Sequence, residues 1–252
     1  MAFDGIVISC LAWELNERLI DGRINKIYQP ETDALVLTIK NNRHNYRLLL
    51  SASPSLPLAY ITEDSGTNPM VAPNFCMLLR KHISGGRIAA ITQPDMERIL
   101  KFEIEHLNEL GDLCTKFLIV ELMGKHSNII FCQPDGTIID SIKHISLNVS
   151  SVREVLPGRS YFVPNTMHKL NPLTVDSETF MHTVLSKPLS TAKALYTSLT
   201  GLSPLVSEEI CHRASIDSSM STSGLNDAEK LHLFGTFRRL MEDIAEHRFL
   251  PE

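Results

Sequence analysis

The chain has 252 residues, of which 43% are hydrophobic and 21% charged, and its formal net charge is −5 at pH 7. This composition is typical of a globular protein with one large core or two smaller ones, and it excludes a disordered chain. No apolar run reaches membrane-spanning length and no signal-peptide pattern begins the chain. We therefore expect a cytoplasmic protein with no membrane partner.

The five cysteines are scattered and none forms a Cys-x-x-Cys pair, which argues against a disulfide framework and a zinc ribbon. No P-loop, dinucleotide-binding or hydrolase motif is present. We expect no metal, no cofactor and no catalytic site. Residues 1–175 are nearly neutral and most of the negative excess lies in 176–252, so a basic surface for nucleic acid must be local.

The first half of the chain predicts a helix, a series of strands and a second helix. Residues 3–21 have amphipathic periodicity, and Asp4 is placed to cap this helix. Residues 74–83 predict the second helix, with Asn74 as its cap and Arg80 and Lys81 in its last turn, where cations suit the helix dipole. The expected strands are 23–28, 34–40, 46–51, 59–61, 88–92, 99–105, 116–121, 127–132 and 137–141.

Two places in this strand pattern carry polar groups on a rigid base. Apolar segments at 117–120 and 128–131 flank a polar turn that contains Lys125 and His126. The pair Glu97-Arg98 directly precedes the strand expected at 99–105. A solvated hairpin tip and a structural salt bridge are the plain alternatives to a functional role at these two places.

The pattern changes near 165–177, and the segments that follow predict helices at 178–185, 190–200, 204–213 and 226–248. The turn at Gly201-Leu202-Ser203 joins two of them: Gly201 ends the first helix and Ser203 caps the second. A turn of this kind leaves backbone N–H groups free at a helix start, where they bind phosphate in helix-hairpin-helix modules. Many plain helical hairpins use the same caps.

Several stretches together resemble the NFACT family, which includes fibronectin-binding protein A and RqcH-like ribosome quality-control proteins. These stretches are 1–5, 22–30, 75–82, 86–88, 121–130, 142–144 and 155–158, with 201–204 resembling the family's helix-hairpin-helix turn. The resemblance implies an α+β fold: an NFACT-N domain over 1–170, similar to the N-terminal domain of formamidopyrimidine-DNA glycosylase, and an all-α helix-hairpin-helix domain over 176–252. Family members continue into a coiled coil and a C-terminal RNA-binding domain, so the chain is expected to be an N-terminal fragment.

The resemblance also implies a function. Family members bind the large ribosomal subunit with an obstructed peptidyl-tRNA and recruit tRNA, alanyl-tRNA in bacteria, to extend the stalled chain without a template. An Asp-Arg pair that engages tRNA in the family corresponds to Glu97-Arg98, with a carboxylate one methylene longer here. Asp4 matches a further family aspartate, and Arg80, Lys81, Lys125 and His126 are added as tRNA contacts on charge alone.

Two alternatives to the tRNA-binding interpretation follow from the same resemblance. A glycosylase-like abasic-site lyase would attack with the N-terminal amine, which here belongs to Ala2 where the glycosylases have proline. An adhesin would bind fibronectin, although the sequence shows no export signal.

Overall fold

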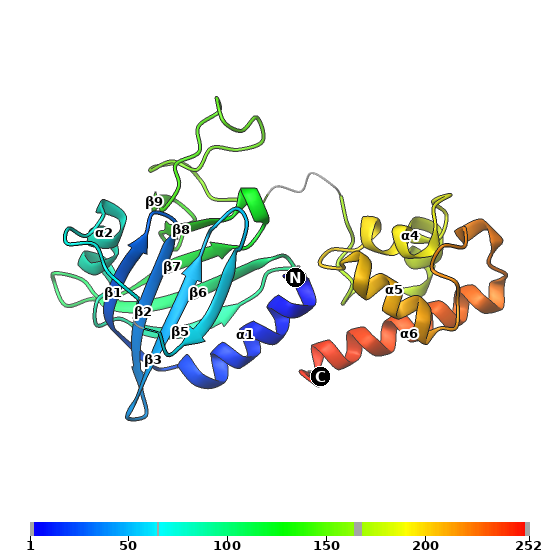
Figure 1. Cartoon of the computed structure of the whole chain (residues 1–252), viewed down its shortest axis with the longest axis horizontal. Helices are drawn as coiled ribbons and strands as arrows, with labels where there is room; N and C mark the ends of the chain where they lie inside the picture. Colours follow the sequence, from blue (N-terminus) through cyan, green and yellow to red (C-terminus); the bar gives the residue numbers. More distant parts are fainter. Residues whose placement is uncertain (1–2, 65, 164–167, 250–252) are drawn as a thin grey trace. The chain divides into compact units, whose positions relative to one another are not determined.

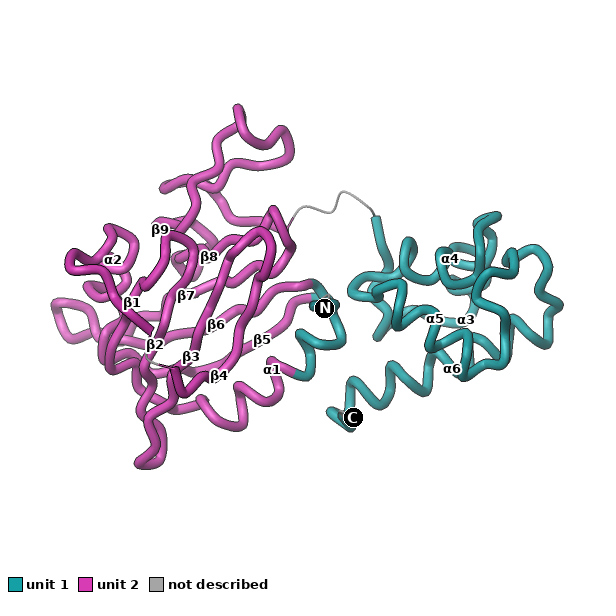
Figure 2. Tube along the Cα trace, in the orientation of Figure 1, with its two compact units in different colours: residues 1–10, 95–97, 165–252 teal, residues 11–94, 98–164 magenta. Residues whose placement is uncertain are grey.

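The computed structural model describes residues 3–64, 66–163 and 168–249 (Figure 1). The chain divides into two compact units, coloured separately in Figure 2. Unit 1 comprises residues 1–10, 95–97 and 165–252, and unit 2 comprises residues 11–94 and 98–164.

Unit 2 is built on one antiparallel sheet of nine strands in the order β4-β3-β2-β1-β5-β6-β7-β8-β9. The two halves of the sheet join where Arg23 of β1 pairs with Arg87 of β5. The strands are β1 (Arg23–Glu31), β2 (Ala34–Asn41), β3 (His44–Ser51), β4 (Leu58–Thr62), β5 (Arg87–Thr92), β6 (Ile99–Leu107), β7 (Leu113–Glu121), β8 (Asn128–Cys132) and β9 (Ile138–Ser141). Every expected strand is present, and several extend further than predicted.

Local sequence explains how these strands are shaped. The β2–β3 hairpin turns at Asn42 and Arg43, whose φ angles of 44° and 70° give the twist that a tight two-residue turn requires. The strand β7 becomes fully buried toward the hairpin that joins it to β8, and β8 is buried along its whole length, as expected for apolar runs at the centre of a core. The predicted hairpin at 117–131 is thus confirmed.

Two helices accompany the sheet. The helix α1 (Gly5–Leu19) buries Ile8, Leu15 and Leu19. The helix α2 (Asn74–Ile83) buries Phe75, Cys76, Leu79 and Ile83. The predicted cap of α2 is wrong: Pro73 occupies the cap position with extended backbone, and no side chain bonds to the first turn. Proline fixes the φ angle that the cap needs, which makes an Asn74 cap unnecessary.

The helical part of unit 1 contains α3 (Ser177–Thr179), a π-helical segment η2 (Phe180–Val184), α4 (Thr191–Ser198), α5 (Pro204–Arg213), a 3₁₀ turn η3 (Thr222–Gly224) and α6 (Asp227–Ala245). Its core packs Phe180 against Phe234 and Phe237, with ring centroids 5.1 Å apart in both pairs. The predicted cap at Ser203 is confirmed on α5. Asn226, expected as the first residue of the last helix, instead caps α6 and forms a capping box with Glu229. The helix expected at 178–185 widens instead into η2.

Among the described residues, no helix is both long and apolar enough to cross a membrane. The same residues contain no cluster of three or more His, Cys, Asp or Glu side chains that could hold a metal ion.

Candidate functional site

Three strand ends of unit 2 meet at one edge of the sheet, and they bring together residues that are distant in the sequence. Ile99 at the start of β6 pairs with Glu121 at the end of β7, and Glu121 pairs with Asn128 at the start of β8. The backbone N–H of Leu122 donates to the carbonyl oxygen of Arg98 at 2.9 Å. Arg98 therefore lies beside the turn that connects β7 to β8.

The loop before β6 fixes the backbone direction at Arg98. Asp95 and Met96 both have left-handed backbone, with φ angles of 44° and 61°, and the Met96 side chain is 2% exposed. Such consecutive non-glycine residues need strong support from their surroundings. After this turn Glu97 is half-buried and Arg98 is exposed. The Arg98 guanidinium has no hydrogen-bond or ion-pair partner among residues 3–64, 66–163 and 168–249.

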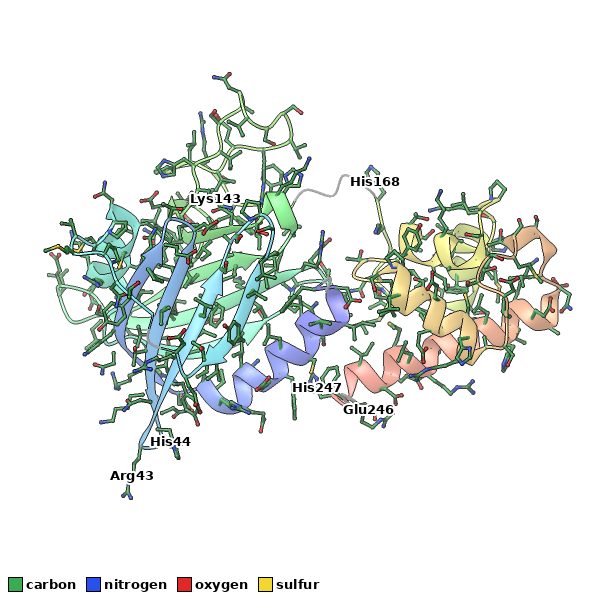
Figure 3. The ribbon with its side chains drawn as sticks, viewed as in Figure 1. Arg43, His44, Lys143, His168, Glu246 and His247 are labelled. Atoms are coloured by element: carbon green, nitrogen blue, oxygen red, sulfur yellow. The ribbon has the colours of Figure 1, made fainter. Side chains whose placement is uncertain are left out.

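The neighbouring turn is a 3₁₀ turn, η1 (Gly124–His126), that exposes Lys125 and His126. The Ser127 hydroxyl accepts from the Met123 N–H at 2.8 Å and closes the turn. Beneath it the Lys143 ammonium, labelled in Figure 3, donates to the Ser127 carbonyl at 3.2 Å and to the Ala52 carbonyl. Burial lowers the pKa of Lys143. Lys143 is partly exposed, and its ammonium links the turn to the Ala52 backbone.

A buried ion pair supports the same edge. The Glu121 side chain is fully buried and accepts from the Arg153 guanidinium at 2.5 Å and from the Tyr161 hydroxyl at 2.9 Å. Arg153 also donates to the Phe162 carbonyl at 2.6 Å. Burial, and next the Glu121 charge, raise the pKa of Tyr161, so its hydroxyl stays protonated and donates. Glu121 is directly followed by Leu122, which holds Arg98.

Asp4 belongs to unit 1 and is 8% exposed. One carboxylate oxygen accepts from the N–H groups of Ile6 and Val7 at 3.1 and 3.0 Å, which is the predicted N-cap of α1. The other oxygen accepts from the Ser203 hydroxyl at 2.6 Å, and Ser203 in turn caps α5 through the Val206 N–H. Asp4 therefore joins the starts of two helices.

Two glycines make this junction close. The Gly5 N–H donates to the Gly201 carbonyl at 2.8 Å. A Cβ atom on Gly5 would lie 2.3 Å from the Met96 carbonyl oxygen, and one on Gly201 would lie 2.4 Å from it. Gly201 also has a φ angle of 75°, which favours glycine. No other residue fits either position without moving the backbone.

Arg80 and Lys81 lie elsewhere in unit 2, at the end of α2. The Arg80 Nε donates to the Ile27 carbonyl at 2.8 Å, and its guanidinium lies 5.7 Å from the centre of the Tyr28 ring. The neighbouring His82 interacts with His106, near the opposite end of β6 from Ile99. Within unit 2 the candidate residues form two groups, Arg98 with Lys125 and His126, and Arg80 with Lys81; within unit 1 Asp4 lies with Gly201 and Ser203.

Sequence reasoning missed the residues that support Arg98. A glutamate at the end of the apolar run 117–120 signals a buried charge that needs a partner. That signal does not identify Arg153 or Tyr161, which are 32 and 40 residues away. Lys143 falls in the family-like stretch 142–144, and nothing in the sequence around it indicates that its ammonium contacts the turn at 124–127.

Comparison with known proteins places these features in a family. The family model for the NFACT N-terminal and middle domains matches residues 4–252. The Rqc2 homolog RqcH of Bacillus subtilis is 38% identical over 252 residues, covering 100% of this chain and 42% of that protein. The archaeal Rqc2 homolog aRqcH of Methanocaldococcus jannaschii is 27% identical over 248 residues, covering 96% and 35% of the two chains.

Solved structures agree with this assignment. The N-terminal part of the fibronectin/fibrinogen-binding protein from Streptococcus suis has a TM-score of 0.81 and 36% identity, covering 96% of this chain and 85% of that one. The fibrinogen binding protein from Staphylococcus aureus has a TM-score of 0.81 and 31% identity, covering 100% and 84%. The chain belongs to the NFACT family. It spans less than half the length of the two curated relatives.

Proposed function

We propose that this chain is the RNA-binding N-terminal part of a cytoplasmic ribosome quality-control protein. In this proposal it engages large ribosomal subunits that carry an obstructed peptidyl-tRNA and recruits alanyl-tRNA for template-free extension of the stalled chain. The family assignment and the names of the RqcH relatives support the ribosome quality-control role. The chain acts as a binding module and has no catalytic step of its own.

The single observation that carries the tRNA proposal is the state of Arg98. It is an exposed guanidinium without a partner among the described residues, held on a rigid strand edge beside Lys125 and His126. A planar guanidinium binds phosphate or a base edge through two parallel hydrogen bonds. A guanidinium without a partner can do so without first breaking an ion pair within the protein. Lys125 and His126 add donors for neighbouring phosphates.

We further propose that residues 1–170 form the NFACT-N domain and residues 176–252 a helix-hairpin-helix domain. The turn at Gly201, Leu202 and Ser203 is then a second phosphate contact. The backbone N–H groups of Leu202 and Ser203 have no hydrogen-bond partner within the described ranges, which supports this role. The Ser203 hydroxyl is engaged by Asp4, so the contact is made by backbone.

The test is tRNA binding by the chain at low salt, where electrostatic contacts are strongest. Arg98→Ala should weaken binding roughly tenfold, within the ~1–3 kcal/mol of a bidentate contact. Arg98→Lys keeps the charge but loses the fork, and an intermediate affinity is expected. Arg213→Ala is the matched control, because Arg213 is an exposed arginine paired with Glu209 in unit 1. Equal affinity for all four proteins would contradict the proposal.

A second candidate function is fibronectin binding, which the names of the solved Streptococcus relatives favour. Retention of the chain on immobilised fibronectin, with affinity unchanged by Arg98→Ala, would support that function independently. The lyase alternative depends on the amine of Ala2, which lies outside the described residues. Incubation with abasic DNA and borohydride tests it directly, because a Schiff base would be trapped as a covalent adduct.

A further inference from the structure

A second polar surface lies on the half of the sheet formed by β1–β4, away from Arg98. Strand register places Lys26, Thr38, Arg47 and Thr62 side by side across the four strands. The next row on the same face runs through Tyr28, Val36, Leu49 and Tyr60. Directly opposed residues in a sheet share a face, so one row of cations and hydroxyls adjoins one row with a tyrosine at each end.

This face forms part of a groove of about 690 Å³. Arg18, Lys26, Arg47 and His44 are lining residues with positive or titratable groups, and Tyr28 supplies a ring on the same face as Lys26. Glu63 is the single carboxylate residue among those described that line the groove. Arg43 and His44 sit at the tip of the β2–β3 hairpin, where Figure 3 labels both. The groove thus combines an excess of cations with aromatic rings.

The cations of the groove keep their charge available. Lys26 is exposed and has no hydrogen-bond or ion-pair partner within the described ranges. Arg47 donates to the backbone carbonyl of Glu63 at 2.8 Å, which leaves its charge uncompensated. Arg18 alone is neutralised, by Glu14 at 3.1 Å. Arg80 adds a further cation beside Tyr28, with its guanidinium 5.7 Å from the ring centre.

We propose that the β1–β4 groove binds a single-stranded segment of RNA. Lys26 and Arg47 contact successive phosphates, and a base stacks against a tyrosine of the groove. Cations give phosphate affinity without sequence preference, and rings bind the faces of unpaired bases. An acidic peptide would use the cations but gain nothing from the rings, so the tyrosines distinguish the two partners. This surface is additional to the Arg98 edge and does not depend on the tRNA proposal.

The experiment measures binding of a fluorescent oligouridylate to the whole chain over a series of salt concentrations. Lys26→Ala/Arg47→Ala should lower the slope of log affinity against log salt by about 1.4, since each phosphate contact on single strands contributes about 0.7. Tyr28→Ser should weaken binding about fivefold or more if a base stacks there. Lys193→Ala/Arg213→Ala removes two cations from unit 1 as the matched control.

Lys26→Glu provides a second variant that does not disturb the fold, because Lys26 has no partner to lose within the described ranges. Reduced affinity in Lys26→Glu and Tyr28→Ser, with normal circular dichroism, supports the proposal. The proposal is overturned if Lys26→Glu binds oligouridylate as tightly as wild type. It is also overturned if Tyr28→Ser binds like wild type and polyglutamate competes for the groove as well as RNA does.

Discussion

Replacing Arg153 with methionine leaves the Glu121 carboxylate without its cation inside the core of unit 2. The Glu121 side chain is fully buried and that of Arg153 is 12% exposed, so water cannot replace the lost partner. Removing one member of a buried ion pair costs about 3–5 kcal/mol of unfolding free energy. Tyr161→Phe removes one hydrogen bond to the same carboxylate, and we expect a smaller loss of ~1.5–3 kcal/mol.

The assay is urea unfolding followed by the fluorescence of Trp13, the single tryptophan of the chain, which belongs to unit 2. Linear extrapolation gives the unfolding free energy of each variant. The triple variant Glu121→Leu/Arg153→Met/Tyr161→Phe removes both charges and the hydroxyl together. Apolar replacement of a whole buried ion pair is often neutral or stabilising, so this variant should recover most of the loss.

The reasoning is refuted if Arg153→Met costs less unfolding free energy than Tyr161→Phe. That result would mean that the carboxylate finds another partner or becomes hydrated. It would also remove the basis for treating this ion pair as the support of the Arg98 edge. Binding of tRNA by Arg153→Met should fall only where the variant begins to unfold.

Three further outcomes follow from the structure. Gly201→Ala should lower the unfolding temperature of unit 1 by several degrees, because the new Cβ would lie 2.4 Å from the Met96 carbonyl oxygen. A calorimetric scan measures this temperature, and an unchanged transition would contradict the close contact. Burial and next the charge of Lys81 lower the pKa of His82 in the folded chain. Below the ordinary histidine pKa of about 6.5, His82 therefore binds a proton more readily in the unfolded chain than in the folded one. Stability present above about pH 6.5 should therefore be lost as pH falls, and His82→Gln should flatten this dependence in urea titrations. Burial raises the pKa of Cys132 to about 12 and of Cys211 to about 11, so mass spectrometry after iodoacetamide treatment should find both unmodified until urea is added, while half-exposed Cys114 reacts.

Local signals predicted most of the fold because they depend on neighbouring residues. Alternation of apolar and polar side chains identified the strands, and the Ser203-Pro204 signature identified the start of α5. The predicted cap of α2 was wrong because asparagine and proline both suit a helix start, and the sequence alone does not decide which of the two residues takes the cap position. The widening into η2 has no comparable local signal.

The candidate site was less predictable because it depends on register. Glu97-Arg98 and Lys125-His126 were each identified in the sequence, but their proximity follows from the pairing of Ile99 with Glu121. Hydrophobic alternation determines which face of the sheet a residue occupies, but it does not determine which residue of the next strand pairs with it. The partners of Glu121 are set by contacts over still longer separations, which no single-sequence pattern encodes.

Asp4 and Arg98 must therefore be interpreted differently when they are substituted. Asp4→Ala removes three hydrogen bonds at the joined starts of α1 and α5, so lost RNA binding would accompany a lower unfolding temperature. Asp4→Asn keeps an acceptor for the cap and should retain most stability. Arg98→Ala removes no side-chain hydrogen bond within the described ranges, and its unfolding temperature should equal that of wild type. Loss of tRNA affinity at constant stability is therefore the result that distinguishes a contact residue from a structural one, and Arg98 is the residue of this pair that can give it.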